Sequence, residues 1–199
     1  MAVFKINPDS YKNQSCILNT LIYIQNPQKS VYNGSNNMFI PFTENTAALI
    51  QANQFLYIKN FYRKQSGKQI EHFMLSFDTT DEEKKLSLNT MINIANRLSY
   101  CLLEEYQVVF SIHKPNFKNP NYHIHFIMNS VNLNTGKHFR LNKSNFISFM
   151  DSIANFLKLY HIALRGYSYT NKQGFFHKGG YNGLSLYGET MNKYTYYKI

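Results

Sequence analysis

The stretch VVFSIH at residues 108–113 and, after a polar loop, the stretch YHIHFIMN at residues 122–129 decide how this chain folds. Both runs are rich in β-branched and aromatic residues, which favour β-strands. Successive side chains of a strand point to opposite faces, so His123 and His125 share one face while the other face is wholly apolar. We therefore expect two strands whose apolar faces pack on a core.

Three histidines meet if these two runs pair. An antiparallel hairpin across residues 114–121 brings His113, at the end of the first run, onto the same face as His123 and His125. A single histidine on a strand is more often solvated or hydrogen-bonded than a ligand, but three imidazoles on adjacent strands make one side of a metal site. The remaining coordination positions stay open, as a catalytic rather than a structural ion requires.

The size and composition of the chain fit one globular domain. Its 199 residues are enough to bury a substantial core, and 44% apolar residues with 16% aromatic residues are unlike a disordered chain. The N-terminus has no signal-peptide pattern, and Cys16 and Cys101 have no metal or redox spacing. We therefore expect a cytoplasmic protein with reduced, buried thiols, either a single domain or the N-terminal part of a longer protein.

The charge of the chain indicates its partner. A formal net charge of +10, from 21 Lys and Arg against 11 Asp and Glu, favours a polyanion: nucleic acid first, a membrane surface second. No apolar run approaches transmembrane length, so membrane insertion is not expected. Residues 165–199 are basic, aromatic and glycine-rich, and two interpretations stay open: a groove that neutralises phosphates and stacks bases, or a flexible basic tail.

Hydrophobic periodicity predicts the other elements. Residues 28–42 are expected to be mainly loop, and Ser144 is expected to cap the last helix. The order of elements indicates an α/β fold, a two-layer sandwich with helices packed on a central, mainly antiparallel sheet. The expected strands are residues 3–6 and 69–78, with shorter candidates at 38–40 and 138–141, and the expected helices are residues 15–25, 43–62, 80–102 and 144–160.

Two of these elements carry candidate site residues. In the helix at residues 15–25 the centre of the apolar stripe lies nearly opposite Tyr23 at about 100° per residue, so the tyrosine points away from the packed face. An ordinary exposed tyrosine would look the same. In the strand at residues 69–78, His72 and Ser76 lie on the face opposite the apolar one.

Three segments together resemble the motifs of MobP-type conjugative relaxases, a family of the HUH endonuclease superfamily. Residues 21–30, LIYIQNPQKS, look like the motif that carries the nucleophilic tyrosine, and residues 71–77, EHFMLSF, look like the second motif, which lies along the DNA. Residues 123–132, HIHFIMNSVN, preceded by residues 108–113, resemble the third motif, which carries the metal histidines. The three occur in the family order.

The resemblance implies a metal-dependent enzyme that nicks single-stranded origin-of-transfer DNA and rejoins or transfers the strand. Tyr23 would become linked to the 5′ phosphate and release a 3′ hydroxyl, and His113, His123 and His125 would hold Mn²⁺ or Mg²⁺, although other transition metals occupy such sites in vitro. The implied partners are accessory relaxosome proteins and a coupling protein. The residues expected to contact DNA or line the site are His72, Ser76, Asn129, Lys29, Arg140 and Arg165.

One departure from the family leaves the general base unassigned. Many relaxases have an acidic residue just after the first histidine of the third motif, whereas this chain has Lys114 and then a longer loop. Asp78 and Glu71 are candidates for the base by strand position only, and His72 is either a fourth ligand or a DNA contact. Two alternatives stay open: a rolling-circle replication initiator and a noncatalytic basic domain that binds nucleic acid.

Overall fold

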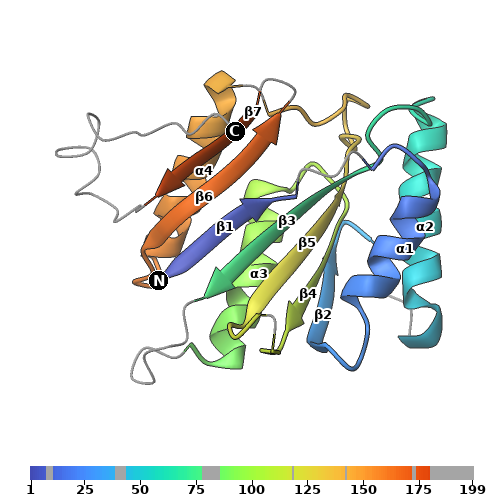
Figure 1. The fold of residues 1–199 in the computed structure, drawn as a ribbon. Helices are drawn as coiled ribbons and strands as arrows, with labels where there is room; N and C mark the ends of the chain where they lie inside the picture. The colour runs from blue at the N-terminus through green and yellow to red at the C-terminus, as the bar shows by residue number, and fades with distance from the viewer. Residues whose placement is uncertain are drawn as a thin grey trace.

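The computed structural model describes residues 1–7, 11–38, 44–77, 86–117, 119–141, 143–171 and 174–179. Strands and helices alternate along most of the chain (Figure 1). The elements are β1 (Ala2–Ile6), α1 (Ser15–Ile24), β2 (Ser30–Asn36), α2 (Glu44–Phe61), β3 (Ile70–Phe77), α3 (Leu88–Leu102), β4 (Val108–His113), β5 (His123–Asn129), α4 (Lys143–Lys158), β6 (Leu164–Asn171) and β7 (Gly174–Gly179).

All the described strands join one sheet, in the order β2-β4-β5-β3-β1-β6-β7. The first five are antiparallel to their neighbours, β6 runs parallel to β1, and β7 returns antiparallel to β6. The predicted α/β sandwich with a central, mainly antiparallel sheet is therefore confirmed. The strands that carry the histidines, β4 and β5, lie side by side within the sheet.

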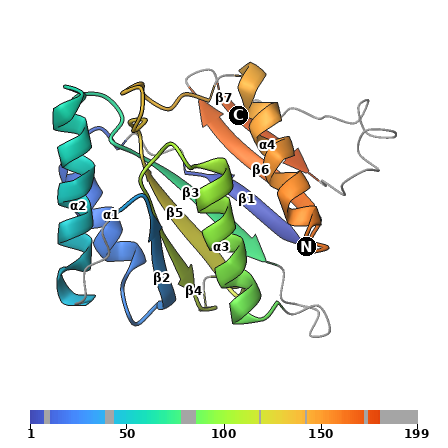
Figure 2. The same ribbon diagram turned by 180° about the vertical axis from the view of Figure 1, so that it is seen from behind.

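Helices lie on both faces of the sheet, which adds a helical layer to the predicted two (Figures 1 and 2). The alternation of side chains explains both layers, because each strand presents a different set of residues to each side. Phe110, Ile124 and Phe126 belong to the larger core, which packs against α3 and α4. Val109 and Ile127 face the other way and pack against α1 and α2 in a smaller core.

The smaller core fixes α1 against the sheet. Ile17, Leu21 and Ile24 recur at helical spacing and are completely buried. Burial of each such side chain stabilises the fold by about 1.5–3 kcal/mol. The helix therefore has a defined rotation, and its last turn is held above β4.

Sequence periodicity missed three strands. Residues 30–36, SVYNGSN, lack an apolar alternation and were expected to be loop, yet they pair with β4 along their length as an edge strand. The candidate strand at residues 38–40 is wrong at residue 38, and residues 39 and 40 lie outside the described part. Residues 138–141 make only an isolated bridge between Val131 and His138. Of the segment at residues 165–199, residues 165–171 and 174–179 belong to β6 and β7, and residues 172–173 and 180–199 lie outside the described part.

The predicted helices are confirmed, with changes at their ends. The Ser87 hydroxyl caps α3 by accepting a hydrogen bond from the Thr90 amide at 3.1 Å, whereas the acidic start at residues 80–83 lies outside the described part. Ser144, expected to precede the last helix, is instead the second residue of α4. The prediction of buried thiols is wrong, because Cys16 is partly buried and Cys101 is exposed. Among the described residues, no helix has the length and apolar character needed to cross a membrane.

The strand β2 depends on close packing at Gly34, which faces the ring of Phe110 on β4. A Cβ at position 34 would lie 2.2 Å from the Phe110 ring. We predict that Gly34→Ala lowers the free energy of unfolding by about 1–3 kcal/mol because the buried ring must shift. Urea denaturation measures the loss. Val31→Ala on the same strand, at a side chain that is 40% exposed, should cost less than about 0.5 kcal/mol. Equal losses in the two variants would contradict this packing.

Candidate functional site

The three predicted histidines meet at one end of the β4–β5 pair. His113 pairs directly with His123, and Ser111 pairs with His125, so the antiparallel register places all three rings on one face. One ring nitrogen from each lies within 4.8 Å of the others. The ring centroids are 5.2 Å apart for His113 and His123, 4.5 Å for His113 and His125, and 5.0 Å for His123 and His125. We call these residues the histidine triad.

In each ring of the triad, one nitrogen has a hydrogen-bond partner outside the triad. His113 Nε2 donates to the Ile24 carbonyl at 2.6 Å, and His123 Nδ1 donates to the Asn121 carbonyl at 2.9 Å. His125 Nδ1 lies 2.9 Å from His72 Nε2. Outer hydrogen bonds of this kind orient the rings of metal ligands and fix which nitrogen carries the proton. The other nitrogen of each ring is left to offer a lone pair.

The surroundings of the triad keep its rings uncharged. Burial is the largest cause, and it lowers the pKa of His113 and of His123 below the usual 6.5. For His125, burial is again the largest cause, and the repulsion that any positive charge on His72, the other two rings or Lys29 would exert adds to it, so the pKa is lowered to about 2. Neutral imidazole is the form that binds a metal ion. The site is therefore electrostatically prepared for a cation with strong affinity for nitrogen.

The residues of the triad fit a divalent metal ion. His125 Nε2 is buried and has no hydrogen-bond partner among the described residues, which is costly unless something else satisfies it. A cation shared with His113 and His123 would satisfy it. Imidazole nitrogens suit Mn²⁺, Zn²⁺, Ni²⁺ and Cu²⁺ better than Mg²⁺, so transition metals are the better fit to this donor set.

Tyr23 lies beside the triad. Its ring centroid is 6.2 Å from that of His113 and 6.0 Å from that of His125, and its side chain is 48% exposed. The end of α1 explains this position of Tyr23. The carbonyl of Ile24 has no partner within the helix and accepts the hydrogen bond from His113. That bond anchors the last turn and with it the neighbouring Tyr23. The predicted exposure of this tyrosine is confirmed.

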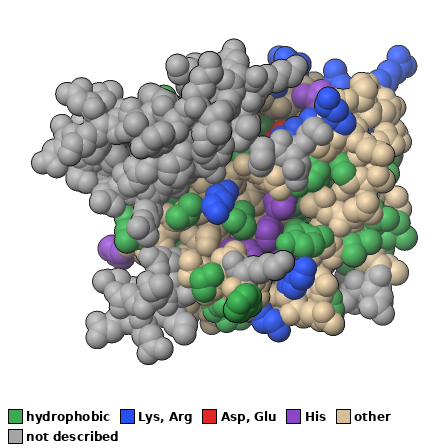
Figure 3. All heavy atoms as spheres, in the orientation of Figure 1, with side chains coloured by type: hydrophobic (Ala, Val, Ile, Leu, Met, Phe, Trp, Pro, Cys, Tyr) green, Lys and Arg blue, Asp and Glu red, His purple; other side chains and the backbone are tan. Residues whose placement is uncertain are grey.

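Lys29 supplies a positive charge next to the tyrosine. Its Nζ lies 4.4 Å from the centroid of the Tyr23 ring, a cation–π contact. The Lys29 carbonyl accepts a hydrogen bond from the Lys114 amide at 3.0 Å, which ties this loop to the end of β4. In Figure 3, histidine side chains are visible at the centre of the face, with Lys or Arg side chains around them.

Some of the other predicted site residues lie near the triad and some do not. His72 contacts His125, and Ser76 pairs with His123 across β3 and β5. Asn129 lies at the far end of β5, where it is completely buried and donates to the Phe55 carbonyl and to Gln107. It therefore stabilises the fold and does not line the site.

Two further candidates, Arg140 and Glu71, are not brought to the triad. Arg140 is exposed in the segment before α4, and the side chain of Arg165 lies outside the described part. Glu71 pairs with Lys68 at 2.6 Å, and it alternates with His72 along β3, so it points to the opposite face and is unsuited to act as the base. Asp78 lies outside the described residues.

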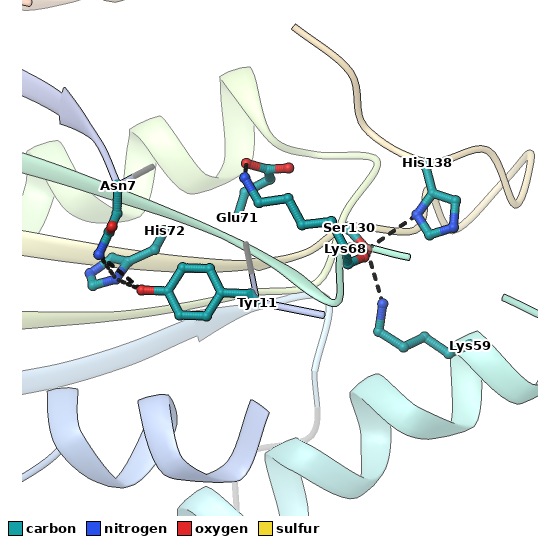
Figure 4. Close-up of polar contacts among 8 residues, drawn as sticks. All are labelled: Asn7, Tyr11, Lys59, Lys68, Glu71, His72, Ser130 and His138. Atoms are coloured by element: carbon teal, nitrogen blue, oxygen red, sulfur yellow. Dashed lines mark hydrogen bonds and ion pairs between the residues drawn. The ribbon is translucent and has the colours of Figure 1, made fainter. Parts of the chain in front are cut away.

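Sequence reasoning missed the partners of His72. The Tyr11 hydroxyl lies 2.9 Å from His72 Nδ1, and Asn7 donates to that hydroxyl at 2.9 Å (Figure 4). Both residues come from the segment between β1 and α1, which has no periodic pattern, and only the fold brings it to β3. No signal in the sequence marks them.

A second buried polar group lies away from the triad. Lys59 of α2 is completely buried and donates to the Ser130 hydroxyl at 2.9 Å, beside His138 (Figure 4). Burial lowers the pKa of Lys59 to about 8, and the nearby Cys16 and Glu71 oppose this shift. Its hydrogen bond joins α2 to the end of β5, so we assign it a structural role.

Comparison with known proteins shows a match over most of the chain. The family model described as "Relaxase: MobA/VirD2-like, nuclease domain" matches residues 23–161. The matched span begins at Tyr23 and includes the whole histidine triad. Among curated proteins, no sequence matches the chain significantly.

Solved structures share its fold. The MobM relaxase domain (MOBV; Mob_Pre) bound to plasmid pMV158 oriT DNA, a Mn-bound crystal structure at pH 5.5, matches with a TM-score of 0.53 at 11% identity over 82% of this chain and 88% of that chain. A structure described as "Molecular Basis of Vancomycin Resistance Transfer in Staphylococcus aureus" matches with a TM-score of 0.52 at 11% identity, over 86% and 99%. At such identities the likeness shows the fold alone.

The geometry of the triad predicts that metal binding needs each of its rings. Replacement of His113, His123 or His125 by alanine should weaken Mn²⁺ binding about 100-fold or more, because one of three nitrogen ligands is lost. Isothermal titration calorimetry at constant pH measures the affinity. His161→Asn is the control, since His161 is exposed outside the triad and asparagine tolerates its backbone φ of 56°. Unchanged affinity in all three alanine variants would refute the site.

Proposed function

The chain belongs to the MobA/VirD2-like relaxase nuclease-domain family, and from this premise we propose that Tyr23 nicks single-stranded DNA at an origin of transfer with the help of the histidine triad. The observation that carries the proposal is the position of the Tyr23 ring beside two of the three histidines. A nucleophile and a candidate metal site thus share one accessible face. We retain the MobP subtype and the HUH superfamily as predictions.

The proposed substrate follows from charge and from a structural relative. The chain carries a formal charge of +10, and positive charge near a strand of DNA neutralises phosphates and releases counterions. The MobM relaxase domain, which shares the fold, is described as bound to oriT DNA. Accessory relaxosome proteins and a coupling protein are the further partners that we propose.

The reaction is a transfer of a phosphodiester bond. The Tyr23 oxygen forms a bond to phosphorus and loses its proton, the bond from phosphorus to the 3′ oxygen breaks, and that oxygen takes up a proton as a 3′ hydroxyl. The tyrosine ends linked to the 5′ phosphate. Because one ester replaces another, attack by a 3′ hydroxyl can reverse the step and rejoin or transfer the strand.

The residues around Tyr23 have separate roles in this scheme. A divalent ion on the triad, when bound, supplies positive charge at a non-bridging phosphate oxygen, where charge builds up in the transition state. Lys29 lies over the phenol ring and stabilises the negative charge that develops on the tyrosine as its proton leaves. Ser76 pairs with His123 across β3 and β5, and this position supports the proposal that it contacts the DNA.

The proposal predicts that Tyr23→Phe abolishes nicking while DNA binding stays within about twofold, because the change removes only the attacking oxygen. A fluorescently labelled oriT strand with Mn²⁺ measures cleavage, and fluorescence anisotropy measures binding. Tyr57→Phe is the control, since Tyr57 is 68% exposed on α2 and should be fully active. Full nicking by Tyr23→Phe would refute the assignment, and absence of nicking by the parent protein on its cognate origin would favour a noncatalytic DNA-binding domain.

The role of Lys29 predicts a charge-dependent rate. Lys29→Met should lower the single-turnover cleavage rate by roughly 3- to 30-fold, because the cation next to the phenol is lost, and Lys29→Arg should recover most of it. The rate is measured at saturating DNA, which separates it from binding. Lys137→Met removes an exposed lysine outside the site and is the matched charge control. An equal loss in the control, or none in Lys29→Met, would contradict the role.

A further inference from the structure

We infer that His72 and Tyr11 are positioning residues that set which nitrogen of His125 carries the proton, and so prepare His125 to bind the metal ion. The inference rests on the metal site of the proposed function. It concerns the group formed by Asn7, Tyr11 and His72, which we call the outer network. None of its members is proposed to touch the ion or the DNA.

The outer network is a continuous row of short contacts that ends on the triad. Asn7 Nδ2 donates to the Tyr11 hydroxyl at 2.9 Å, that hydroxyl lies 2.9 Å from His72 Nδ1, and His72 Nε2 lies 2.9 Å from His125 Nδ1. Figure 4 shows Asn7 and Tyr11, both from the segment between β1 and α1, pointing toward His72 of β3. Both ring nitrogens of His72 are therefore engaged, so it is not free to be a fourth ligand.

Only one arrangement of protons is compatible with a metal on His125. Two imidazole nitrogens 2.9 Å apart share one proton. If His72 Nε2 holds it, a neutral His125 must carry its own proton on Nε2, the buried atom that has no partner. If His125 Nδ1 holds it, His125 Nε2 has a free lone pair that can bind a cation.

The outer end of the network can accommodate the second arrangement. When His125 donates to His72 Nε2, the neutral His72 ring carries its proton on Nδ1 and needs an acceptor there. The Tyr11 oxygen is that acceptor, and it accepts from Asn7 as well. Asn7 Nδ2 also lies 3.3 Å from His72 Nδ1, a longer contact between two donors in this arrangement. The Nδ1 protons of His125 and of His72 then both have acceptors.

The backbone holds the outer network in place. Tyr11 has a φ of 40°, a conformation that a residue other than glycine adopts at a cost of about 1–3 kcal/mol when its surroundings enforce it. The Tyr11 carbonyl accepts from the Gln69 amide at 2.8 Å, and the Asn7 amide donates to the His72 carbonyl at 2.8 Å. Two backbone bonds to the start of β3 thus fix the positions of Asn7 and Tyr11 relative to His72.

The consequence is a more basic and better oriented ligand. An outer acceptor that takes the Nδ1 proton of a metal-binding histidine raises the electron density at the other nitrogen, and its loss typically costs 10- to 100-fold in metal affinity. A carboxylate often has this role. Here a neutral imidazole backed by a phenol has it, in a site where His72 is only 7% exposed and hydrogen bonds are correspondingly strong.

The test measures Mn²⁺ affinity without DNA, from the electron paramagnetic resonance signal of free Mn²⁺ at one fixed pH. We expect His72→Phe to lower the affinity about 10- to 100-fold. His72→Gln, which keeps an acceptor near the former Nε2, should recover much of the loss. Tyr11→Phe should lower the affinity about three- to tenfold, because the Nδ1 proton of His72 loses its acceptor.

Tyr62→Phe is the matched control, since it removes a tyrosine hydroxyl that donates to the Leu133 carbonyl away from the triad, and its Mn²⁺ affinity should be unchanged. In ¹⁵N-labelled metal-free protein, long-range ¹H–¹⁵N spectra should show His125 protonated on Nδ1, and this preference should weaken in His72→Phe. Three results would overturn the inference. Folded His72→Phe could bind Mn²⁺ with wild-type affinity, His72→Gln could bind Mn²⁺ no better than His72→Phe, or His125 in the parent protein could carry its proton on Nε2.

The outcome is separable from that of the proposed function. A parent protein that binds Mn²⁺ with the expected ranking of variants but does not nick DNA supports the outer network and refutes the enzyme. A parent protein that nicks DNA while His72→Phe binds Mn²⁺ normally supports the enzyme and refutes the outer network. A parent protein that binds no Mn²⁺ refutes the outer network as a support for metal binding.

Discussion

The rest of the site depends on the desolvation of three imidazoles at one end of the β4–β5 pair. The pairing register of the two strands brings the rings together, and burial lowers their pKa values and keeps them neutral. Each ring therefore offers an unprotonated nitrogen with a lone pair at the same place. Protonation there would cost free energy, whereas a divalent cation would be stabilised. The two helical layers make this possible, because they exclude water from the sheet while the end of α1 leaves the face next to Tyr23 accessible.

A single hydrogen bond connects the proposed metal site to the proposed nucleophile. The carbonyl at the end of α1 would lack a partner, as helix ends do, and His113 supplies one. The same bond orients a ligand ring and holds the turn that carries Tyr23 and leads to Lys29. On the other side of the triad, His72, backed by Tyr11, is the outer hydrogen-bond partner of His125, just as the Ile24 carbonyl at the helix end is the outer partner of His113. The chain thus orients the rings of the histidine triad with neutral groups, and the residue just after His113 is a lysine rather than an acidic residue.

Side-chain alternation predicted the centre of this protein well. It placed His113, His123 and His125 on one face and the residues of the larger core on the other, because burial of one face specifies strand register strongly. It missed β2, since an edge strand such as SVYNGSN is stabilised by backbone pairing and by the contact of Gly34 with Phe110 rather than by an apolar pattern. Asn129 was expected to line the site because it shares a strand face with His123 and His125. It lies at the opposite end of β5, so a shared face did not mean a shared site. Tyr11 was beyond prediction, since a long-range fold contact alone brings it to His72.

The central claim is that Tyr23, which α1 holds beside the triad, forms the covalent bond between protein and DNA through its side-chain oxygen. The most direct measurement is mass spectrometry of the peptide that carries a nucleotide after the protein reacts with single-stranded cognate origin DNA and Mn²⁺ and is digested. Our account predicts one adduct, on the Tyr23 oxygen through the 5′ phosphate, that disappears when a chelator removes the metal. An adduct on Tyr11, Tyr32 or a histidine would contradict it.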